Sequence, residues 1–444
     1  MIMDDSIKTW YRQVIRSRLR ETNPGPEAEA FIREFDARID TAGSSQLPVE
    51  LRRRIEDLGL DRLDATSDAR RPGATLARRL IRTAFGVKPH LCRPQADVKS
   101  TRVLHAIAEL QIGGAQQLVF DLTNSASGSS IHQVITRNIG IRFNPSVPHS
   151  EIRGNVDRMR RAFDRFKPEL VHVCHYHAGL SIRAWYQKVF EIALERDLPI
   201  VQSHCVIGDP WLGGVQQHLV FCSDWSRACS QVPEIPDSVI SPGSPFERFR
   251  APRRTLGSNP LIGMVYRLAG DKIDGSVLPL LTSMLRRIPQ AHLQVVGDGP
   301  IRSVLSRGLE DAGLASRVTW TGFVPFKRLP ELHRGFDLAI APVLADTFGS
   351  GAVHSIISGT PVIGYGVAAI PSILRREEAI VTPGDTKEYV EKISAVLNDD
   401  HLHASIHETK RLHAEAHFQV EQMNRRYHDL FHRVADEHSA ADST

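Results

Sequence analysis

The stretch GMVYRLAGDKID, which spans Gly263–Asp274, sets the pattern of the second half of the chain. Its apolar start predicts a buried strand, which is followed at once by Arg267 and then by Lys272. Arginine offers a planar fork of donors and lysine a mobile point charge, so the pair is able to neutralise a diphosphate without a metal. Two solvated surface charges are the simpler interpretation, but their place at the carboxyl end of a predicted strand favours the binding role.

Apolar runs and helix-length segments alternate on both sides of this stretch. In the second half we expect strands at Leu261–Arg267, Leu293–Gly297, Val318–Thr321, Leu338–Pro342, Pro361–Gly364 and Ala379–Thr382, and helices at Gly275–Arg287, Arg302–Ala312, Leu329–Gly335 and Val353–Ser358. In the first half we expect strands at Thr101–Ala106, Ile131–Thr136, Leu170–His175, Pro199–His204, Leu219–Ser223 and Val239–Ser241, and helices at Ala115–Asn124, Val156–Phe166 and Ser181–Asp197. Such alternation predicts parallel sheets with helices on both faces, which bind ligands beyond the carboxyl ends of their strands.

The chain is therefore expected to be an α/β protein with two Rossmann-like domains that face a cleft, and with an α-helical N-terminal extension. The predicted boundaries are 1–95 for the extension, 96–248 for the first domain, 249–415 for the second domain and 416–444 for a C-terminal helix. The segment Ser244–Pro260 is punctuated by prolines and is expected to be the interdomain linker. The stretch from Glu388 to Glu437 is expected to be helical.

Composition narrows the classes of function. In 444 residues, 55 basic and 51 acidic residues nearly balance, which gives no indication of nucleic-acid binding. The sequence has no apolar run long enough for a transmembrane helix, and its N-terminus does not resemble a secretory signal. Its 5 cysteines lack paired spacing, which argues against a disulfide framework and a zinc site. We therefore expect a cytoplasmic enzyme.

Two further segments combine small residues with a predicted helix start. Gly113 and Gly114 precede the first helix, and Gly349-Ser350-Gly351 leads from Asp346 into the helix that carries His354. Small residues let a phosphate approach the backbone, and the amides of a helix N-terminus attract an anion. The helix dipole should also disfavour the protonated form of the histidine. A tight turn and a structural histidine are the alternative interpretations.

Two other segments resemble binding sites less closely. The segment Gly297–Pro300 starts like a dinucleotide fingerprint, but Arg302 occupies the place of its last glycine, so a helix start is the better interpretation. Three histidines lie within His172–His177 at the end of a predicted strand. Strand alternation sends neighbouring side chains to opposite faces, and no carboxylate stands nearby, so a metal site is disfavoured.

The first 95 residues carry apolar residues at helical spacing beside many arginines. From Arg70 to Arg93 every charged residue is basic. Basic amphipathic helices lie on anionic membrane surfaces, so peripheral contact with the inner face of a membrane is one expectation. Packing on the first domain, with the arginines in water, is the alternative.

Five segments of the second half, taken in order, resemble the motifs of the family 4 glycosyltransferases, which have the GT-B fold. They are GMVYRLAGDKID, LQVVGDGP, VTWTGFVP, DTFGSGAVHSIISGTPVIG and VTPGD. In the first half, IGGAQQ resembles the glycine pair with which that family contacts phosphate. The segment HYHAGL resembles a loop of the related glycogen and starch synthases.

The resemblance implies roles for individual residues. Arg267 and Lys272 match the pair that holds the donor diphosphate, and Asp346 stands where a glutamate contacts the donor sugar. His177 matches an active-site histidine near that sugar, and His175 stands at the place of the preceding aspartate. The implied donor-binding residues are Gly113, Gly114, Gly349, Ser350, Gly351, His354 and Val324, the last in a segment whose backbone contacts the base.

Two positions depart from the family's pair of glutamates. Asp346 keeps the charge of the first glutamate with a shorter reach. His354 replaces the second, which accepts hydrogen bonds from both ribose hydroxyls, whereas a neutral imidazole has one acceptor nitrogen. Losing one charged hydrogen bond costs about 1.5–3 kcal/mol, or about ten- to a hundred-fold in affinity.

The implied function is that of a retaining glycosyltransferase. It would move a hexose from a nucleotide diphosphate sugar to the hydroxyl of a glycan or lipid-linked acceptor in surface polysaccharide synthesis. A UDP-sugar is the favoured donor, and a GDP-sugar is the next choice. The resemblance implies no metal and no cofactor beyond the donor substrate. A non-catalytic binding or scaffold protein is the alternative, and His354 is its main support. A nicotinamide-dependent dehydrogenase conflicts with the incomplete fingerprint, and a glycoside hydrolase conflicts with the lack of a placed carboxylate pair.

Overall fold

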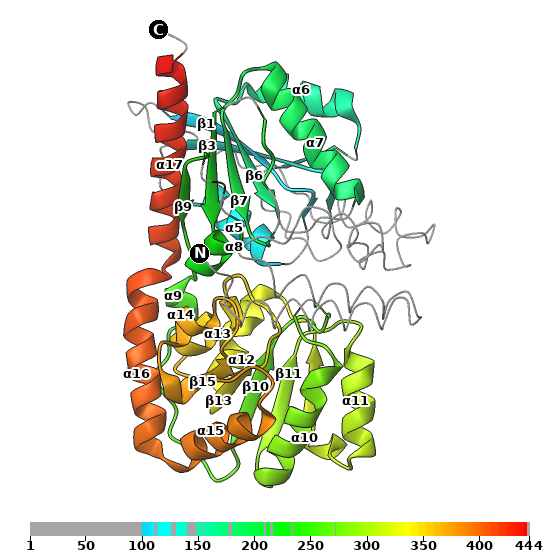
Figure 1. The fold of residues 1–444 in the computed structure, drawn as a ribbon, viewed down its shortest axis with the longest axis vertical. Coiled ribbons are helices and arrows are strands. Elements are labelled where there is room, and N and C mark those ends of the chain that lie inside the picture. The colour runs from blue at the N-terminus through cyan, green and yellow to red at the C-terminus, as the bar shows by residue number, and fades with distance from the viewer. Residues whose placement is uncertain are drawn as a thin grey trace, which may run out of the picture. The chain divides into compact units, whose positions relative to one another are not determined.

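The computed structural model describes residues 100–110, 113–125, 130–139, 149–152, 154–175, 180–207, 210–213, 216–230, 232, 234–270 and 272–441. These residues fall into two compact units (Figure 1). The N-terminal unit contains the described residues up to Gly243 together with those from Glu421 onward. The C-terminal unit contains Ser244–Val420. The predicted helical extension, residues 1–95, lies outside the described residues.

The N-terminal unit is built on a parallel sheet of seven strands in the order β5-β3-β1-β6-β7-β8-β9. The strands are β1 (Thr101–Ala106), β3 (Ser130–Thr136), β5 (His149–Glu151), β6 (Leu170–His175), β7 (Ile200–His204), β8 (Gln217–Phe221) and β9 (Asp237–Val239). A separate pair consists of β2 (Glu109–Leu110) and β4 (Asn138–Ile139). The helices are α5 (Gly114–Thr123), α6 (Val156–Phe166), α7 (Leu180–Glu195), α8 (Asp224–Ser230) and α17 (Val420–Ala441).

Both faces of this sheet are covered, and strand alternation decides which side chain faces which helix. Leu104 and Val173 belong to an apolar core that includes residues of α6 and α7. His105 and His172 are sequence neighbours of these two residues on β1 and β6, so their side chains point to the opposite face of the sheet. There they face α17, and both rings contact Phe431. Apart from Thr101 and these histidines, the buried residues of β1 and β6 are apolar, as is typical of a parallel sheet buried on both sides.

A chain of buried hydrogen bonds connects the sheet to α17. His105 lies 2.8 Å from His132 through one ring nitrogen and 2.8 Å from His172 through the other. His172 then lies 2.8 Å from the Ser203 hydroxyl, which lies 2.9 Å from the Tyr427 hydroxyl on α17. A neutral imidazole has one donor and one acceptor nitrogen, so the chain suits uncharged histidines. Burial lowers the pKa of His132 to about 3 and that of His105 well below 6.5.

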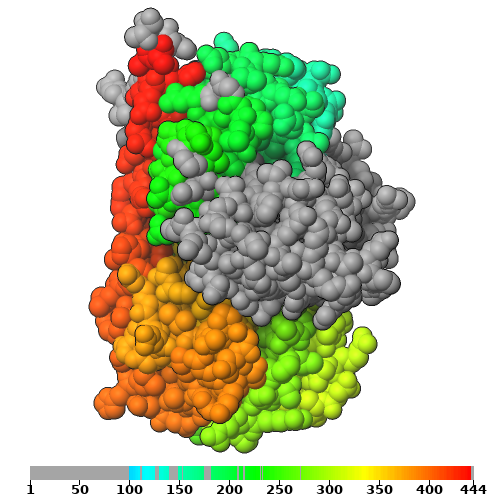
Figure 2. All heavy atoms as spheres, viewed as in Figure 1, coloured from blue at the N-terminus to red at the C-terminus, as the bar shows by residue number. Residues whose placement is uncertain are grey.

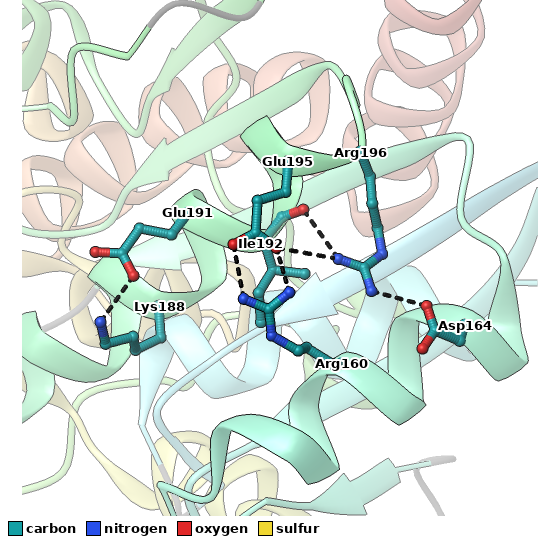
Figure 3. A network of polar contacts seen from close by, with 7 residues as sticks. All are labelled: Arg160, Asp164, Lys188, Glu191, Ile192, Glu195 and Arg196. Carbon is teal, nitrogen blue, oxygen red and sulfur yellow. Dashed lines mark hydrogen bonds and ion pairs between the residues drawn. The ribbon is translucent and has the colours of Figure 1, made fainter.

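The outer surface of α6 and α7 carries ion pairs that join the two helices (Figure 3). Arg160 of α6 pairs with Glu195 at the end of α7. Arg196 Nη2 lies 2.7 Å from Asp164 Oδ1. Exposed pairs of this kind contribute about 0.2–1 kcal/mol each, so the apolar core contributes most of the stability of this unit.

The C-terminal unit is built on a parallel sheet of six strands in the order β12-β11-β10-β13-β14-β15. In chain order this is 3-2-1-4-5-6, the strand order of Rossmann folds. The strands are β10 (Leu261–Val265), β11 (His292–Val296), β12 (Val318–Gly322), β13 (Leu338–Ala341), β14 (Val362–Tyr365) and β15 (Ile380–Val381).

The helices of this unit alternate with its strands. They are α9 (Phe246–Phe249), α10 (Leu278–Arg287), α11 (Arg302–Asp311), α12 (Leu329–Gly335), α13 (Ser350–Ile357), α14 (Ile370–Leu374), α15 (Thr386–Asn398) and α16 (Asp400–His417). Short 3-10 turns occur at Gly275–Val277, Ala315–Arg317, Phe326–Arg328 and Glu377–Ala379. Figure 2 shows part of the surface of this unit, with α15 and α16 in orange.

Several predicted bounds are confirmed to the residue, among them the strands Thr101–Ala106 and Leu170–His175. The segment Ser244–Pro260 is more than the predicted linker, because α9 lies within it and packs on α12 and α13. Phe249 of α9 is fully buried. The helix expected at Arg302–Ala312 is confirmed as α11, which begins at Arg302, two residues after Pro300. Among the described residues, no helix combines the length and the apolar content needed to cross a membrane.

Candidate active site

Most of the predicted site residues follow the strands at which each sheet reverses its order. The reversal lies between β1 and β6 in the N-terminal unit and between β10 and β13 in the C-terminal unit. Ligands of open α/β sheets bind at this point, beyond the carboxyl ends of the strands. In the C-terminal unit, Arg267 follows β10, and Asp346 and the start of α13 follow β13.

The backbone around Arg267 is fixed by the loop after β11. The Tyr266 N–H donates to the Val296 carbonyl at 3.1 Å, and the Leu268 N–H donates to the Asp298 carbonyl at 3.1 Å. Gly297 makes this approach possible, since its φ is +134° and a Cβ at this position would overlap the carbonyl oxygen of Tyr266. The Gly297–Pro300 segment therefore holds the backbone next to Arg267 in place, while the side chain of Arg267 is exposed.

The structure brings Lys272 and Asp346 together. Lys272 Nζ lies 3.0 Å from Asp346 Oδ1, and both side chains are largely buried. A backbone bond ties the same two segments, because the Leu344 N–H donates to the Lys272 carbonyl at 2.9 Å. An ammonium group has three donors, so one bond to Asp346 leaves others for an anion.

The segment Gly349-Ser350-Gly351 forms the start of α13. Gly349 is the N-cap residue with φ +94°, and a Cβ there would stand 2.6 Å from Cδ1 of Ile373. The Ala352 N–H donates to the Gly349 carbonyl at 3.0 Å, so the amides of Ser350 and Gly351 precede the first bond within the helix. Amides in this position, together with the helix dipole, favour an anion.

His354 lies in a cluster of aromatic rings. It stacks on Phe249 with ring centroids 4.1 Å apart and an interplanar angle of 10°, and its edge contacts involve Phe326 and His333. Burial lowers the pKa of His354 to about 3, so the ring is neutral near neutral pH. The helix dipole also predicts a lowered pKa for His354, but in the structure the lowering is caused by burial.

The remaining predicted residues are placed as follows. Val324 is half-buried in the loop after β12. Gly113 is the N-cap of α5 and Gly114 its first residue, both exposed in the N-terminal unit. His175 ends β6. Its side chain and the whole of His177 lie outside the described residues. The predicted donor-binding residues of the C-terminal unit thus follow the carboxyl ends of its strands, and the predicted glycine pair lies in the N-terminal unit.

Two contributions were not predicted. The Tyr266 ring lies against the first turn of α13, with its Cζ 3.5 Å from a Cβ built at Gly351. Phe249 supplies the face on which His354 stacks. The motif around Arg267 contains the tyrosine, but its sequence does not reveal which helix the ring contacts. Phe249 lies in a segment whose prolines predict a linker.

Comparison with known proteins agrees with this architecture. Residues 260–399 match the family model of the glycosyl transferases group 1. The 2-deoxystreptamine glucosyltransferase of Streptomyces kanamyceticus is 28% identical over 178 residues, which cover 39% of this chain and 46% of that protein. The D-inositol 3-phosphate glycosyltransferase of Nocardia farcinica is 26% identical over 274 residues, 56% of this chain and 58% of that protein. The chain thus spans about half the length of these relatives.

A solved structure shows the same fold over most of this chain. The structure of Anabaena HepE in complex with UDP and glucose covers 74% of this chain and 99% of its own, with a TM-score of 0.61 and 17% identity. Together with the family match, this confirms the expected GT-B fold of two Rossmann-like units. Residues 260–399 form a glycosyl transferases group 1 domain. The chain is related to GT-B glycosyltransferases that are similar to family 4.

Proposed function

We propose that the protein is a retaining glycosyltransferase that moves a hexose from a nucleotide diphosphate sugar to a hydroxyl acceptor. The observation that carries the proposal is the positive edge of the C-terminal sheet, where Arg267, Lys272 and the first turn of α13 follow β10 and β13. When the bond between sugar and diphosphate breaks, negative charge develops on the leaving diphosphate. Fixed positive groups at this place stabilise that charge.

Other residues complete the proposed reaction. Asp346 orients the donor sugar and, through its bond to Lys272, holds the ammonium group in position. The resemblance gives His177 a role near the reacting carbon, and we propose that Gly113 and Gly114 hold phosphate or sugar oxygens at the start of α5. As the resemblance implies, the acceptor attacks from the face that the diphosphate leaves, and no metal is required.

The donor is proposed to be a UDP-sugar, with a GDP-sugar as the next choice. HepE supports the first choice, since that protein was solved in complex with UDP and glucose. The acceptor is proposed to be a glycan or a lipid-linked intermediate of surface polysaccharide synthesis. Residues 1–95 are proposed to bring the protein to the inner face of an anionic membrane, because their stretch from Arg70 to Arg93 is strongly basic.

Thermal unfolding in the presence of UDP, GDP, ADP and their sugar conjugates tests the donor site. A ligand at about 100 times its dissociation constant adds about 2.7 kcal/mol to the free energy of unfolding. We expect one nucleotide series to raise the melting temperature of the wild type. Arg267→Ala should lose this response, since it removes a charge at the diphosphate.

Arg286→Ala is the matched control, because Arg286 is an exposed arginine on α10 of the same unit. It should respond to the nucleotide as the wild type does. An undiminished response in Arg267→Ala would contradict the diphosphate role of that residue.

A non-catalytic binding protein is the second candidate function. The observation that favours it is His354, whose neutral ring is packed between aromatic side chains where the family has a carboxylate. A wild type that responds to no nucleotide in the same unfolding experiment would favour this second function.

A further inference from the structure

An open cavity of about 630 Å³ lies in the C-terminal unit, between the segment that follows α9 and the helix α16. Its charged lining residues are Arg250, Arg253, Glu408 and Arg411. Sites for small molecules have volumes of about 300–1,000 Å³, so the cavity is large enough for one. It is separate from the candidate donor site, none of whose described residues lines it.

The cavity and the candidate donor site lie at opposite ends of α13. Ala251 belongs to the cavity wall, and its N–H donates to the carbonyl of Ile357 at 3.3 Å. Ile357 is the last residue of α13, whereas Gly349, Ser350 and Gly351 lie at its start. A ligand in the cavity is therefore expected to leave the donor site open.

The wall of the cavity is positive. Three of its four charged side chains are arginines, whose charge is permanent. His407 also lines the cavity, but burial lowers its pKa to about 4, so its ring is neutral at pH 7. Among the described residues of the wall, Glu408 is the one carboxylate. The wall thus favours a ligand with more than one negative charge.

Arg253 is held in place from behind the cavity wall. Its two Nη atoms donate to the two carboxylate oxygens of Asp400 at 2.6 and 3.0 Å. Its Nη1 also donates to Nδ1 of His403 at 3.0 Å, and Nε2 of His403 donates to the Asp337 carbonyl at 2.7 Å. Neither Asp400 nor His403 lines the cavity. A guanidinium group that is fixed in this way loses little further freedom when it binds a ligand.

The other two arginines are also oriented by carboxylates. Arg411 pairs with Glu408 and with Glu415, in each case at 2.7 Å. Arg250 Nη2 lies 3.3 Å from Glu415 Oε1, and the Arg250 side chain is 60% exposed. A guanidinium group has five N–H donors, and these pairs use only some of them. Each arginine therefore keeps donors for a ligand.

We propose that this cavity is a second anion-binding site, which takes a phosphorylated small molecule. A phosphate group carries up to about two negative charges and three acceptor oxygens, so it accepts from more than one arginine at once. The planar fork of arginine matches phosphate oxygens with two parallel hydrogen bonds. Glu408, which is exposed at the same wall, accepts a hydrogen bond from a hydroxyl group of the ligand. The inference goes beyond the proposed transferase activity and does not depend on it.

Calorimetry with inorganic pyrophosphate tests the site in the full-length protein. The parent protein and all variants carry Arg267→Ala, so that the proposed donor site does not contribute, and sodium chloride keeps the ionic strength constant. We expect the parent to bind pyrophosphate. The further change Arg250→Gln should weaken this binding about ten-fold, since it removes a charged hydrogen bond. Because the Arg250 side chain is largely exposed, its loss should leave the melting temperature nearly unchanged.

Ala404→Phe tests the shape of the site independently of its charge. Ala404 is half-buried in the cavity wall, and a phenyl ring at this position fills the space while every arginine stays. We expect this variant to lose measurable binding of pyrophosphate. Arg286→Gln is the matched control, because it removes an exposed arginine of α10 that does not line the cavity. It should bind pyrophosphate as the parent does.

A parent protein that does not bind pyrophosphate would overturn the inference. An equal loss of binding in Arg286→Gln would also overturn it, since the anion would then respond only to the general charge of the protein. Undiminished binding in both Arg250→Gln and Ala404→Phe would place the anion elsewhere. If Ala404→Phe melts well below the parent, the comparison of Arg250→Gln with Arg286→Gln decides.

Discussion

Gly297 shows how a residue without a functional group controls the position of one that has it. The glycine lies in the loop after β11, and its lack of a Cβ lets the carbonyl of Tyr266 approach. Backbone hydrogen bonds to Val296, the last residue of β11, and to Asp298 of this loop then fix the segment from which the guanidinium group of Arg267 extends. The geometry of the charged residue thus depends on a distant part of the chain.

Gly297→Ala should therefore reduce nucleotide binding as well as stability. The variant combines a positive φ of 134° with a clash against a backbone atom that cannot move without moving Arg267. Gly313→Ala is the control, since Gly313 has φ +72° and no atom stands within 4 Å of its Cβ position. The control should cost about 1 kcal/mol of backbone strain.

Chemical denaturation measures the loss of stability in each variant, and the response of the melting temperature to UDP, GDP and ADP measures binding. Gly297→Ala should cost more than the control and should lose the nucleotide response. A variant that keeps the response of the wild type would show that the loop does not position Arg267.

At the level of single residues, the sequence predicts charges better than contacts. Lys272 and Asp346 are both within recognisable motifs, but their ion pair joins segments far apart in the chain. The neutral state of His354 is predictable from the helix dipole, yet its actual cause is burial beside Phe249, which cannot be anticipated from a segment that looks like linker. Among the described residues the hydroxyl of Tyr266 has no hydrogen-bond partner, which depends on packing that no local pattern specifies.

The C-terminal helix α17 is joined to its sheet by uncharged histidines. His428 of this helix lies 3.1 Å from the Ser130 hydroxyl, and its ring contacts His132. Burial lowers the pKa of His428 to about 4 and that of His132 to about 3. Both folded-state values lie below the ordinary value near 6.5, so the unfolded chain binds more protons than the folded one between those limits.

Acid should therefore destabilise the protein through these histidines. As the pH falls below about 6.5, the free energy of unfolding decreases, and each such histidine contributes a loss of about 2 kcal/mol at pH 5. Melting temperatures at pH 7.5, 6 and 5 should show this decline. The double variant His132→Gln, His428→Gln should melt lower than the wild type at pH 7.5 but should decline less between pH 7.5 and 5.

His401→Gln is the control for the acid experiment, because His401 is exposed on α16. It should follow the wild type at each pH. A double variant that declines as steeply as the wild type would show that these two histidines do not account for the acid sensitivity.

The elements themselves are largely predictable, because buried parallel strands and amphipathic helices leave clear patterns. Short elements are the exceptions. The helix α9 has four residues in a proline-containing segment, too few for a helical period to appear, and its burial of Phe249 comes from tertiary packing. The two-residue strands β2 and β4 lack a pattern for the same reason.

At the scale of the whole molecule, the basic N-terminal segment is expected to add membrane binding to the proposed transferase activity. Deletion of residues 1–95 should abolish sedimentation with vesicles that contain anionic lipid, since the extension supplies the basic amphipathic segments. Neutral vesicles and a high salt concentration serve as controls, because both weaken electrostatic attraction. Unchanged sedimentation of the deletion variant would contradict a membrane role for these residues.

The presence of two Rossmann-like units follows from strand–helix alternation, and the ordered motifs predict which half binds the donor. The assignment of α17 to the N-terminal unit does not follow from the sequence. Its partners Ser130 and Ser203 are more than two hundred residues away in the chain, and a helical pattern carries no information about which sheet it covers.

This return of the chain has a consequence for biosynthesis. The ribosome makes the strands of the N-terminal unit first, yet the helix that covers one face of their sheet emerges only after Ser244–Val420. The unit that is made first is therefore finished last. During that interval the sheet face that α17 will cover exposes His105 and His172, whose imidazoles are well hydrated and partly charged in water. Most parallel sheets would expose aliphatic side chains at such a face. A nascent chain with such a face is less prone to stick to its neighbours before it is complete.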